Sequence, residues 1–589
     1  SLSLIAVFVP IGTMGEVIGQ FFAQFGLTVA FAVIFSTFSA YSLTPMLSAH
    51  WLINPKDEEK KPRNKFVQKF LDLFEEKFQE FRKLYSDSIA AAMNHAKLII
   101  VISIAFLVGS AALIPFIGME FQPTYDSGEF SISAIAPSNV SVERMAEIMK
   151  PVEEIVIKEP GIRLIGMRLG GNRIPPNQAT IEVKLKDIDE RDKSMQTIMD
   201  DLRLKLKDIK NVKLAVMSGQ GAGRGDKRPV QIGIQGADLK ELEKYANEMA
   251  AEIKKIPGAT DVDLSSFEAE PEVIVRIDQS KASRLGLTPT SVGNVVQMAF
   301  QGKTTTNKFT FTDHDFDIRV QLEEKQQKNI DDVRNLLISN TEGKFVRLAD
   351  IADVTLESGP TKIDRYNRER QVAVYANTVG ISAGELTNKI QKDIVPALNL
   401  PEGYYTTLIG SSDMMTRSFG EIYKALALAI IVIYMVLAAE FESFSQPLVI
   451  MMSLPLALTG AILGLLITGL TINMMSLIGF AMLLGLVTKV AILLIDYTNQ
   501  ARAKGMNIRD ALKESCSLRL RPILMTSVST MLGIVPIALG LGAGAELRQS
   551  MGVVILGGMI SSTFLTLIVV PLFYLVFEEW KEKHFTTKE

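Results

Sequence analysis

Residues 474–495 read MMSLIGFAMLLGLVTKVAILLI, an apolar run that contains a single charge, Lys489. Its length is close to the roughly 20 residues that an α-helix needs to cross a bilayer. Further apolar runs of similar length lie at about 26–48, 98–117, 423–439, 447–470, 522–541 and 551–577. A buried soluble helix can imitate one such run, but not five of them clustered near the C-terminus. The sequence therefore predicts seven membrane helices.

The composition indicates two environments, one in lipid and one in water, because the 589 residues are 48% hydrophobic and 22% charged. The net charge of -3 shows no basic surplus, so nucleic acid is not an expected partner. A single cysteine, Cys516, excludes a disulfide or a cysteine-based metal site within the chain. The opening SLSLIAVFVP lacks the basic start of a signal peptide. We expect residues 1 to about 14 to end a membrane helix that begins upstream.

Basic residues in short loops predict the orientation. They gather in three places: between 56 and 65, between 502 and 521, and from 581 to the end. All three groups belong on the cytoplasmic side, and counting crossings from any one of them gives the same side for the other two. This topology places residues 118–420 outside the cytoplasm.

An amphipathic helix is predicted at 66–85, before the second span. Its aromatic residues recur at helical spacing: Phe66, Phe70, Phe74, Phe78, Phe81 and Tyr85. We expect it to lie on the cytoplasmic membrane surface. Packing against a neighbouring helix is the alternative.

The outer region contains a repeat. Residues 129–217 alternate as strand, helix, strand, strand, helix and strand, which is the ferredoxin-like βαββαβ order. The same order restarts at 229 and resumes at 371, after an insertion of roughly 100 residues. The predicted fold is a membrane α-helical bundle plus an α+β outer domain with two ferredoxin-like subdomains. We interpret the insertion as a docking or assembly element.

Lys489 is the residue most indicative of chemistry. A lysine inside a membrane span costs on the order of 2.5 to 3.5 kcal/mol, so it needs a carboxylate partner or a water-filled path. No Asp or Glu lies in the interior of a predicted span, so a carboxylate partner is expected on a helix outside this chain. A carboxylate that alternates between protonated and lysine-paired states would make a proton-driven switch. Snorkelling of Lys489 to the cytoplasmic edge is the alternative.

The following span begins RLRPILMTS at Arg519 and places Thr526, Thr530 and Gly533 on one stripe. Such residues usually serve helix packing or interhelical hydrogen bonds. The chain has no Gly-x-x-x-x-Gly-Lys-Ser/Thr element, which argues against a pump driven by ATP.

Five short motifs resemble the resistance-nodulation-division (RND) superfamily, in its hydrophobe/amphiphile efflux branch of AcrB-like multidrug exporters. They are FESFSQP (441–447), GLVTK (485–489), RLRPILMTS (519–527), GAGA (542–545) and GGMI (557–560). The resemblance covers the whole chain, aligned to the C-terminal half of the family. It implies that Lys489, Thr526 and Arg519 form part of a proton relay whose paired aspartates lie upstream. Val490, where the family often has Asn, is a departure in the relay surroundings.

This resemblance implies a secondary transporter, and not an enzyme, which exports amphiphilic small molecules by proton antiport and needs no cofactor. It also implies a homotrimer in the bacterial inner membrane that contacts a periplasmic adaptor, an outer-membrane channel and membrane lipid. The expected domains follow the chain in order: membrane helices in 1–52, a cytoplasmic loop with the amphipathic helix (53–97), a membrane helix (98–117), the first porter subdomain (118–228), the second porter subdomain (229–270 and 361–415), the docking insertion (271–360), five membrane helices (416–578) and a cytoplasmic tail (579–589).

The substrate is less well indicated. Multidrug members usually carry a phenylalanine cluster and a Gly-Phe-rich loop, whereas residues 170–178 read GGNRIPPNQ. Between 129 and 217 Phe130 is the only aromatic residue, and methionines are present instead; they can line adaptable pockets, but core filling is the expected role of most of them. The candidate substrate-binding residues are Phe130, Ser133, Arg173, Ile174 and Met217. A metal exporter of the same superfamily, an RND-like scaffold or export protein, and a membrane-anchored enzyme are the alternatives. The metal branch tends to carry an acidic residue where Lys489 stands, which disfavours metal export. The histidines form no cluster in the sequence, which disfavours an enzyme.

Overall fold

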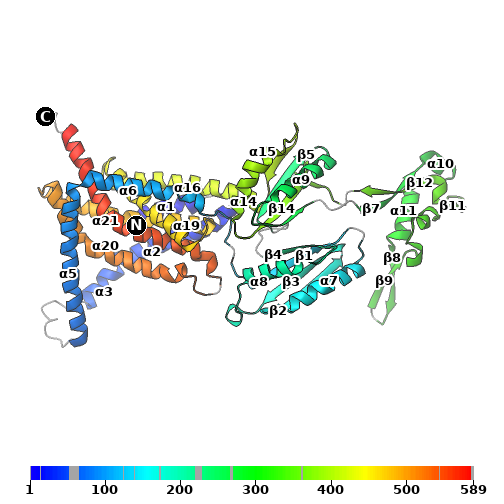
Figure 1. Cartoon of the computed structure of the whole chain (residues 1–589), viewed down its shortest axis with the longest axis horizontal. Coiled ribbons are helices and arrows are strands. Elements are labelled where there is room, and N and C mark those ends of the chain that lie inside the picture. The colour runs from blue at the N-terminus through cyan, green and yellow to red at the C-terminus, as the bar shows by residue number, and fades with distance from the viewer. Residues whose placement is uncertain are drawn as a thin grey trace.

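The computed structural model describes residues 2–12, 15–51, 65–123, 125–137, 140–171, 174–218, 228–265, 270–312, 314–359, 362–542 and 544–585. Three parts follow one another along the long axis of the molecule: a helical bundle, a pair of α/β units and a smaller distal unit (Figure 1). The first two parts are joined by the segment 117–128 and by the start of helix α16 (Gly410–Glu440).

The helices of the bundle come from both ends of the chain. They are α1 (Leu2–Gly12), α2 (Glu16–Tyr41), α3 (Leu43–Trp51), α5 (Lys65–Asn94), α6 (Ala96–Ala111), α16 (Gly410–Glu440), α17 (Gln446–Met451), α18 (Ser453–Thr468), α19 (Met474–Ala503), α20 (Ile508–Ala538) and α21 (Glu546–Phe585). Among the described residues, seven helices or helix pairs are long and apolar enough to span a membrane, and they coincide with the seven predicted runs. The chain is therefore a multi-pass membrane protein.

Small residues bring α18 and α21 into close contact. A Cβ added at Gly460 would lie 2.2 Å from the carbonyl oxygen of Gly557, and one added at Gly557 would lie 2.5 Å from the carbonyl oxygen of Gly460. The hydroxyls of Thr459 and Ser561 are 3.0 Å apart at the same crossing. Close backbone approach and interhelical hydrogen bonds are the usual means of association in lipid, where apolar side chains gain little from leaving the solvent.

The amphipathic helix α5 lies across one end of the bundle, roughly at right angles to the long helices (Figure 1). The Tyr85 hydroxyl donates to the carbonyl oxygen of Leu567 at 2.7 Å, and Arg521 pairs with Glu75 at 3.0 Å. Phe74 and Phe81 remain exposed. The helix therefore packs against α20 and α21 along one side and keeps apolar residues outward. The side chains of Phe66 and Phe70, like the basic loop 52–64, lie outside the described residues.

The first α/β unit contains β1 (Glu129–Ile135), α7 (Val142–Ile157), β2 (Ile162–Gly171), β3 (Ile174–Leu185), α8 (Met195–Leu206) and β4 (Lys213–Ser218). Its sheet order is β2-β3-β1-β4, antiparallel throughout, which is the ferredoxin-like arrangement. The hydroxyls of Ser141 and Ser194 cap the two helices by accepting from the backbone N–H groups three residues on. Both helices cover the same face of the sheet and bury one core with it.

The second α/β unit repeats this plan with the insertion in its middle. Its elements are β5 (Val230–Gly236), α9 (Leu239–Ile253), β6 (Ala259–Leu264), β13 (Asp364–Tyr366), β14 (Glu369–Thr378), α14 (Ala383–Lys389), a π-helical turn (Ile390–Ile394), α15 (Val395–Ala397) and β15 (Tyr405–Leu408). Strands β6, β14, β5 and β15 take the places of β2, β3, β1 and β4. The two units are thus structural repeats.

The inserted unit is carried on the antiparallel pair of β7 (Glu270–Ile277) and β12 (Ala352–Gly359), which is paired over its whole length. Its remaining elements are α10 (Gln279–Arg284), α11 (Pro289–Phe300), β8 (Lys303–Phe311), β9 (His314–Val320), α12 (Ile330–Arg334), β10 (Leu337–Ser339), β11 (Phe345–Arg347) and α13 (Leu348–Ile351). Helix α11 begins at Pro289 behind a Thr288 cap. The β8–β9 hairpin projects from the unit (Figure 1). The aromatic side chains Phe309, Phe311 and Phe316 of this hairpin are exposed.

Candidate functional site

Lys489 lies on the one open side of α19. Of residues 474–492, all of which the structure describes, Lys489 is the only exposed one, and most of the others are buried. Met482, Leu486 and Leu493 are partly open at the same helical spacing, and with Lys489 they form what we call the open stripe. No described acidic side chain pairs with Lys489. The lysine therefore stands uncompensated in the middle of an apolar helix, on the side that the described chain leaves uncovered.

Thr526 and Arg519 lie on α20, which packs beside α19. Among the described residues, the Thr526 hydroxyl donates within its own helix, to the carbonyl oxygens of Pro522 (3.1 Å) and Ile523 (3.0 Å). The Arg519 guanidinium lies 5.1 Å from the ring centroid of Tyr497 on α19, and its buried Nε has no partner among the described residues. The structure thus brings Arg519 against α19. Thr526 is exposed, and no hydrogen bond among the described residues joins it to Lys489.

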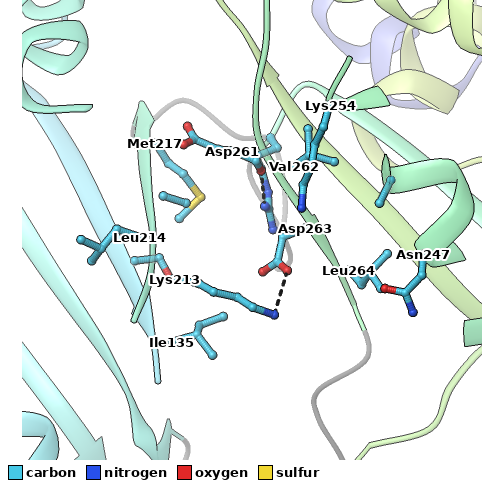
Figure 2. Close-up of a pocket in the computed structure, with 14 residues that line it drawn as sticks. Ile135, Lys213, Leu214, Met217, Asn247, Lys254, Asp261, Val262, Asp263 and Leu264 are labelled. Carbon is cyan, nitrogen blue, oxygen red and sulfur yellow. Dashed lines mark hydrogen bonds and ion pairs between the residues drawn. The ribbon is translucent and has the colours of Figure 1, made fainter. Parts of the chain in front are cut away.

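A second candidate site is a cleft of about 270 Å³ between the two α/β units (Figure 2). One wall comes from β1 and β4 of the first unit, and the other comes from α9 and β6 of the second. Of the predicted substrate-binding residues, Ser133 and Met217 line this cleft. Ile135, Leu214, Val262 and Leu264 add apolar surface.

The other predicted substrate-binding residues are placed differently. Phe130 is 2% exposed and packs in the core beneath α7 and α8. Successive strand residues face opposite sides of a sheet, so Phe130 and Ser133, three positions apart, cannot both line the cleft. Arg173 lies outside the described residues. Ile174 begins β3, and nothing of its side chain is described.

The cleft also contains charged residues from the second unit that sequence reasoning missed. Lys254 follows the end of α9, and Asp261 and Asp263 lie on β6. The acidic alternation in residues 261–264 (DVDL) was the available signal, because it marks a strand with one polar face. Periodicity cannot show, however, that this face lies opposite β4.

A third region, the segment 118–126, fastens the bundle to both α/β units. Met119 bridges to Ile472 in the loop before α19, and its backbone N–H donates to Ser382 Oγ at the start of α14 (3.1 Å). The neighbouring Glu120 accepts a hydrogen bond from the hydroxyl of Thr471. Burial raises the pKa of Glu120, and this single hydrogen bond lowers it by less.

Asp126 ends this segment and holds the first unit. Its carboxylate pairs with Arg191, the two side chains being 5% and 3% exposed, and also accepts from the backbone N–H groups of Met195 (2.7 Å) and Gly128 (3.0 Å). Its own N–H donates to Glu546 at the start of α21 (2.7 Å). Burial alone would raise the pKa of Asp126, but these hydrogen bonds and the Arg191 charge together lower it.

Comparison with known proteins identifies a family and a solved structure that share this architecture. The model of the AcrB/AcrD/AcrF family matches residues 1–578. An X-ray crystal structure of a heavy metal efflux pump superposes with a TM-score of 0.82 at 22% sequence identity, covering 98% of this chain and 58% of that one. The chain thus spans somewhat more than half the length of that pump, and the likeness concerns the fold. The match over nearly all of its residues shows that the chain belongs to the AcrB/AcrD/AcrF family of RND transporters.

Proposed function

We propose that the chain is part of a proton-driven pump that exports amphiphilic small molecules from the cell, and that Lys489 carries the coupling. The supporting observation is the open stripe of α19, where a single lysine lies among apolar residues without an acidic partner in the described chain. An ammonium in lipid is costly unless it meets a carboxylate. We propose that acidic groups from outside these 589 residues cover the stripe and pair with Lys489 when they are ionised.

In this mechanism, protonation of the acidic group abolishes the ion pair, and the helices around α19 repack in response. The potential across the membrane alone supplies about 2.3 kcal/mol per charge for each 100 mV. Arg519 would stabilise the cytoplasmic end of α20 against Tyr497. Thr526 would turn its hydroxyl from its own helix toward the relay.

The test replaces Lys489 with Met in the complete transporter, reconstituted in liposomes with an imposed pH gradient. We expect gradient-driven efflux of a fluorescent amphiphile to fall to background, while assembly by size-exclusion chromatography stays normal. Leu493→Met, in the same open stripe, is the matched control and should transport normally. Thr526→Ala should reduce efflux less than Lys489→Met. Efflux at the unmodified rate by Lys489→Met would remove Lys489 from the mechanism.

The cleft between the two α/β units is the proposed substrate site, with Ser133 and Met217 in its walls. We further propose that 118–228 and 229–270 with 361–415 are porter subdomains, and that 271–360 is a docking subdomain. The exposed β8–β9 hairpin, which presents Phe309, Phe311 and Phe316, supports contact of this unit with other proteins. These proteins would be a periplasmic adaptor and an outer-membrane channel, around a trimer in the bacterial inner membrane.

Metal export is the second candidate, since the solved structure with the similar fold is a heavy metal efflux pump. The described residues contain no group of three or more His, Cys, Asp or Glu side chains arranged to hold a metal ion. Growth of cells with and without the complete pump, measured in the presence of Cu⁺ or Ag⁺ and separately of toxic amphiphiles, distinguishes the two functions. If the pump increases tolerance to the metals and not to the amphiphiles, metal export replaces amphiphile export as the proposed function.

A further inference from the structure

We propose that the cleft between the two α/β units selects amphiphiles with an anionic headgroup, such as a carboxylate or a sulfonate. This inference rests on the proposed function, because it assumes that the cleft receives the transported molecule. It concerns the charge of the substrate, which family membership leaves open. The charged residues that line the cleft are three cations and two anions: Lys213, Arg228, Lys254, Asp261 and Asp263.

Both acidic groups already have cationic partners. The carboxylate of Asp261 pairs with Arg203 (Nε to Oδ2, 3.1 Å) and accepts from the Asn377 amide (2.8 Å). Asp263 lies 3.7 Å from the amine of Lys213 across the cleft, as the dashed line in Figure 2 shows. A cationic ligand would therefore have to compete with existing pairs for either carboxylate.

The ammonium of Lys254 is not matched in this way. Lys254 is exposed, and no described acidic side chain pairs with it. Figure 2 shows its amine directed into the space between the two units. Arg228 is 6% exposed, and its guanidinium is already engaged, because it donates to the main-chain carbonyl of Asp261 (2.7 Å) and lies over the ring of Tyr375. Among the described charged residues of the cleft, Lys254 is therefore the one most available to a ligand, and its charge is positive.

Apolar side chains adjoin this charge. Ile135, Leu214, Met217, Val262 and Leu264 line the same cavity, and methionine adapts well to ligands of different shape. A molecule that places an anion at Lys254 and a hydrocarbon tail against β4 would match both features. A divalent metal ion would meet the Lys254 ammonium, which repels it, and two carboxylates that already have cationic partners.

The test measures binding without a proton gradient, on the complete transporter in lipid nanodiscs. Two fluorescent probes share a dansyl group and an eleven-carbon tail, and one ends in a carboxylate and the other in a trimethylammonium. Empty nanodiscs give the lipid contribution. We expect the carboxylate probe to bind about fivefold more tightly, the size of one partly exposed charge pair, and this preference to shrink as salt is added.

Lys254→Glu should weaken the carboxylate probe and strengthen the trimethylammonium probe, and Lys254→Arg should keep the original preference. Lys255→Glu is the matched control: it makes the same charge change one residue on, at a side chain that pairs with Glu252 and does not line the cleft. It should alter neither affinity. Met217→Trp, which fills the cavity, should weaken both probes.

Equal affinity of the two probes, or an equal loss of both in Lys254→Glu, would overturn the charge preference. Binding that ignores Met217→Trp would show that the probes bind elsewhere and would overturn the site itself. None of these results depends on Lys489, because no gradient is present. Conversely, normal efflux by Lys489→Met would refute proton coupling and leave this binding result intact.

Discussion

Replacing Asp126 with Asn tests how the first α/β unit is fastened to the membrane bundle. The asparagine keeps the size of the side chain but removes its charge and presents an NH₂ group where all the described partners of the carboxylate are donors. These donors are the guanidinium of Arg191 and the backbone N–H groups of Met195 and Gly128. The substitution therefore leaves the buried Arg191 without its counter-ion, although it still donates to two main-chain carbonyl oxygens, and leaves at least one buried N–H without an acceptor.

The magnitude follows from burial. Removing one partner of a buried ion pair costs about 3 to 5 kcal/mol, because the remaining charge stays desolvated. An exposed pair is worth about 0 to 1 kcal/mol. The chain offers such a pair in the same unit, Arg144 with Glu147, whose side chains are 65% and 59% exposed. Glu147→Gln is therefore the matched control.

Hydrogen exchange followed by mass spectrometry measures this difference locally, in peptides that cover the start of α8. A loss of about 3 kcal/mol corresponds to roughly 100-fold faster exchange of the amides that open with this contact. Glu147→Gln should change exchange in its own peptides less than about fivefold. Hydrogen exchange at the start of α8 in Asp126→Asn is compared with exchange in α7 in Glu147→Gln. If the first is accelerated no more than the second, the buried pair does not hold the unit in place.

The pH dependence has a definite sign. Because the pKa of Asp126 is lowered in the folded protein, its stabilisation is present above the ordinary carboxyl pKa. It is lost as the pH falls through the lowered pKa. Protection of the start of α8 from hydrogen exchange should therefore persist at about pH 5 and be lost only in stronger acid. Asp126→Asn should abolish this pH dependence. Fading of protection already near neutral pH would contradict the assigned ion pair.

Two further outcomes are expected. Gly460→Ala should separate α18 from α21, because its new Cβ would lie 2.2 Å from the carbonyl oxygen of Gly557, whereas Gly533→Ala adds a methyl group where nothing lies within 4 Å. Thermal melting in detergent should fall for Gly460→Ala and stay unchanged for Gly533→Ala; equal melting would refute the close contact. Burial raises the pKa of Glu120, so the carboxyl destabilises the junction once it ionises as the pH rises through that pKa. Glu120→Gln cannot ionise and should therefore slow hydrogen exchange at the backbone pair of Ile472 at about pH 8. The gain should shrink toward about pH 5, and a gain independent of pH would show that ionisation of Glu120 is not its cause.

The membrane part of the fold could be predicted because apolar length alone defines a span. The amphipathic helix was predicted too short: α5 continues to Asn94, since Ile89 and Met93 pack into the bundle core beyond the regular aromatic spacing. The helices α7 and α8 could be placed from their apolar periodicity, and the structure adds their serine caps. Local signals of this kind were sufficient because each helix contains its own apolar stripe.

The candidate site was less accessible from sequence. Lys489 could be found because a charge inside an apolar run is conspicuous, whereas its exposure on the open stripe depends on how the other helices pack. The cleft lies between β4 of the first α/β unit and β6 and α9 of the second, and no periodic pattern in the sequence predicts a contact between separate units. Phe130 was chosen for being aromatic, and strand alternation places it in the core instead.

The ladder between β7 and β12 determines how the distal unit can move. Eight consecutive residue pairs tie these strands together, from Ala352 with Ile277 to Gly359 with Glu270. A ribbon that is hydrogen-bonded along its length resists bending within its plane, so the unit beyond it should turn as a rigid lever about the base of the ribbon. A small rotation of the second α/β unit then becomes a larger sideways travel of the β8–β9 hairpin.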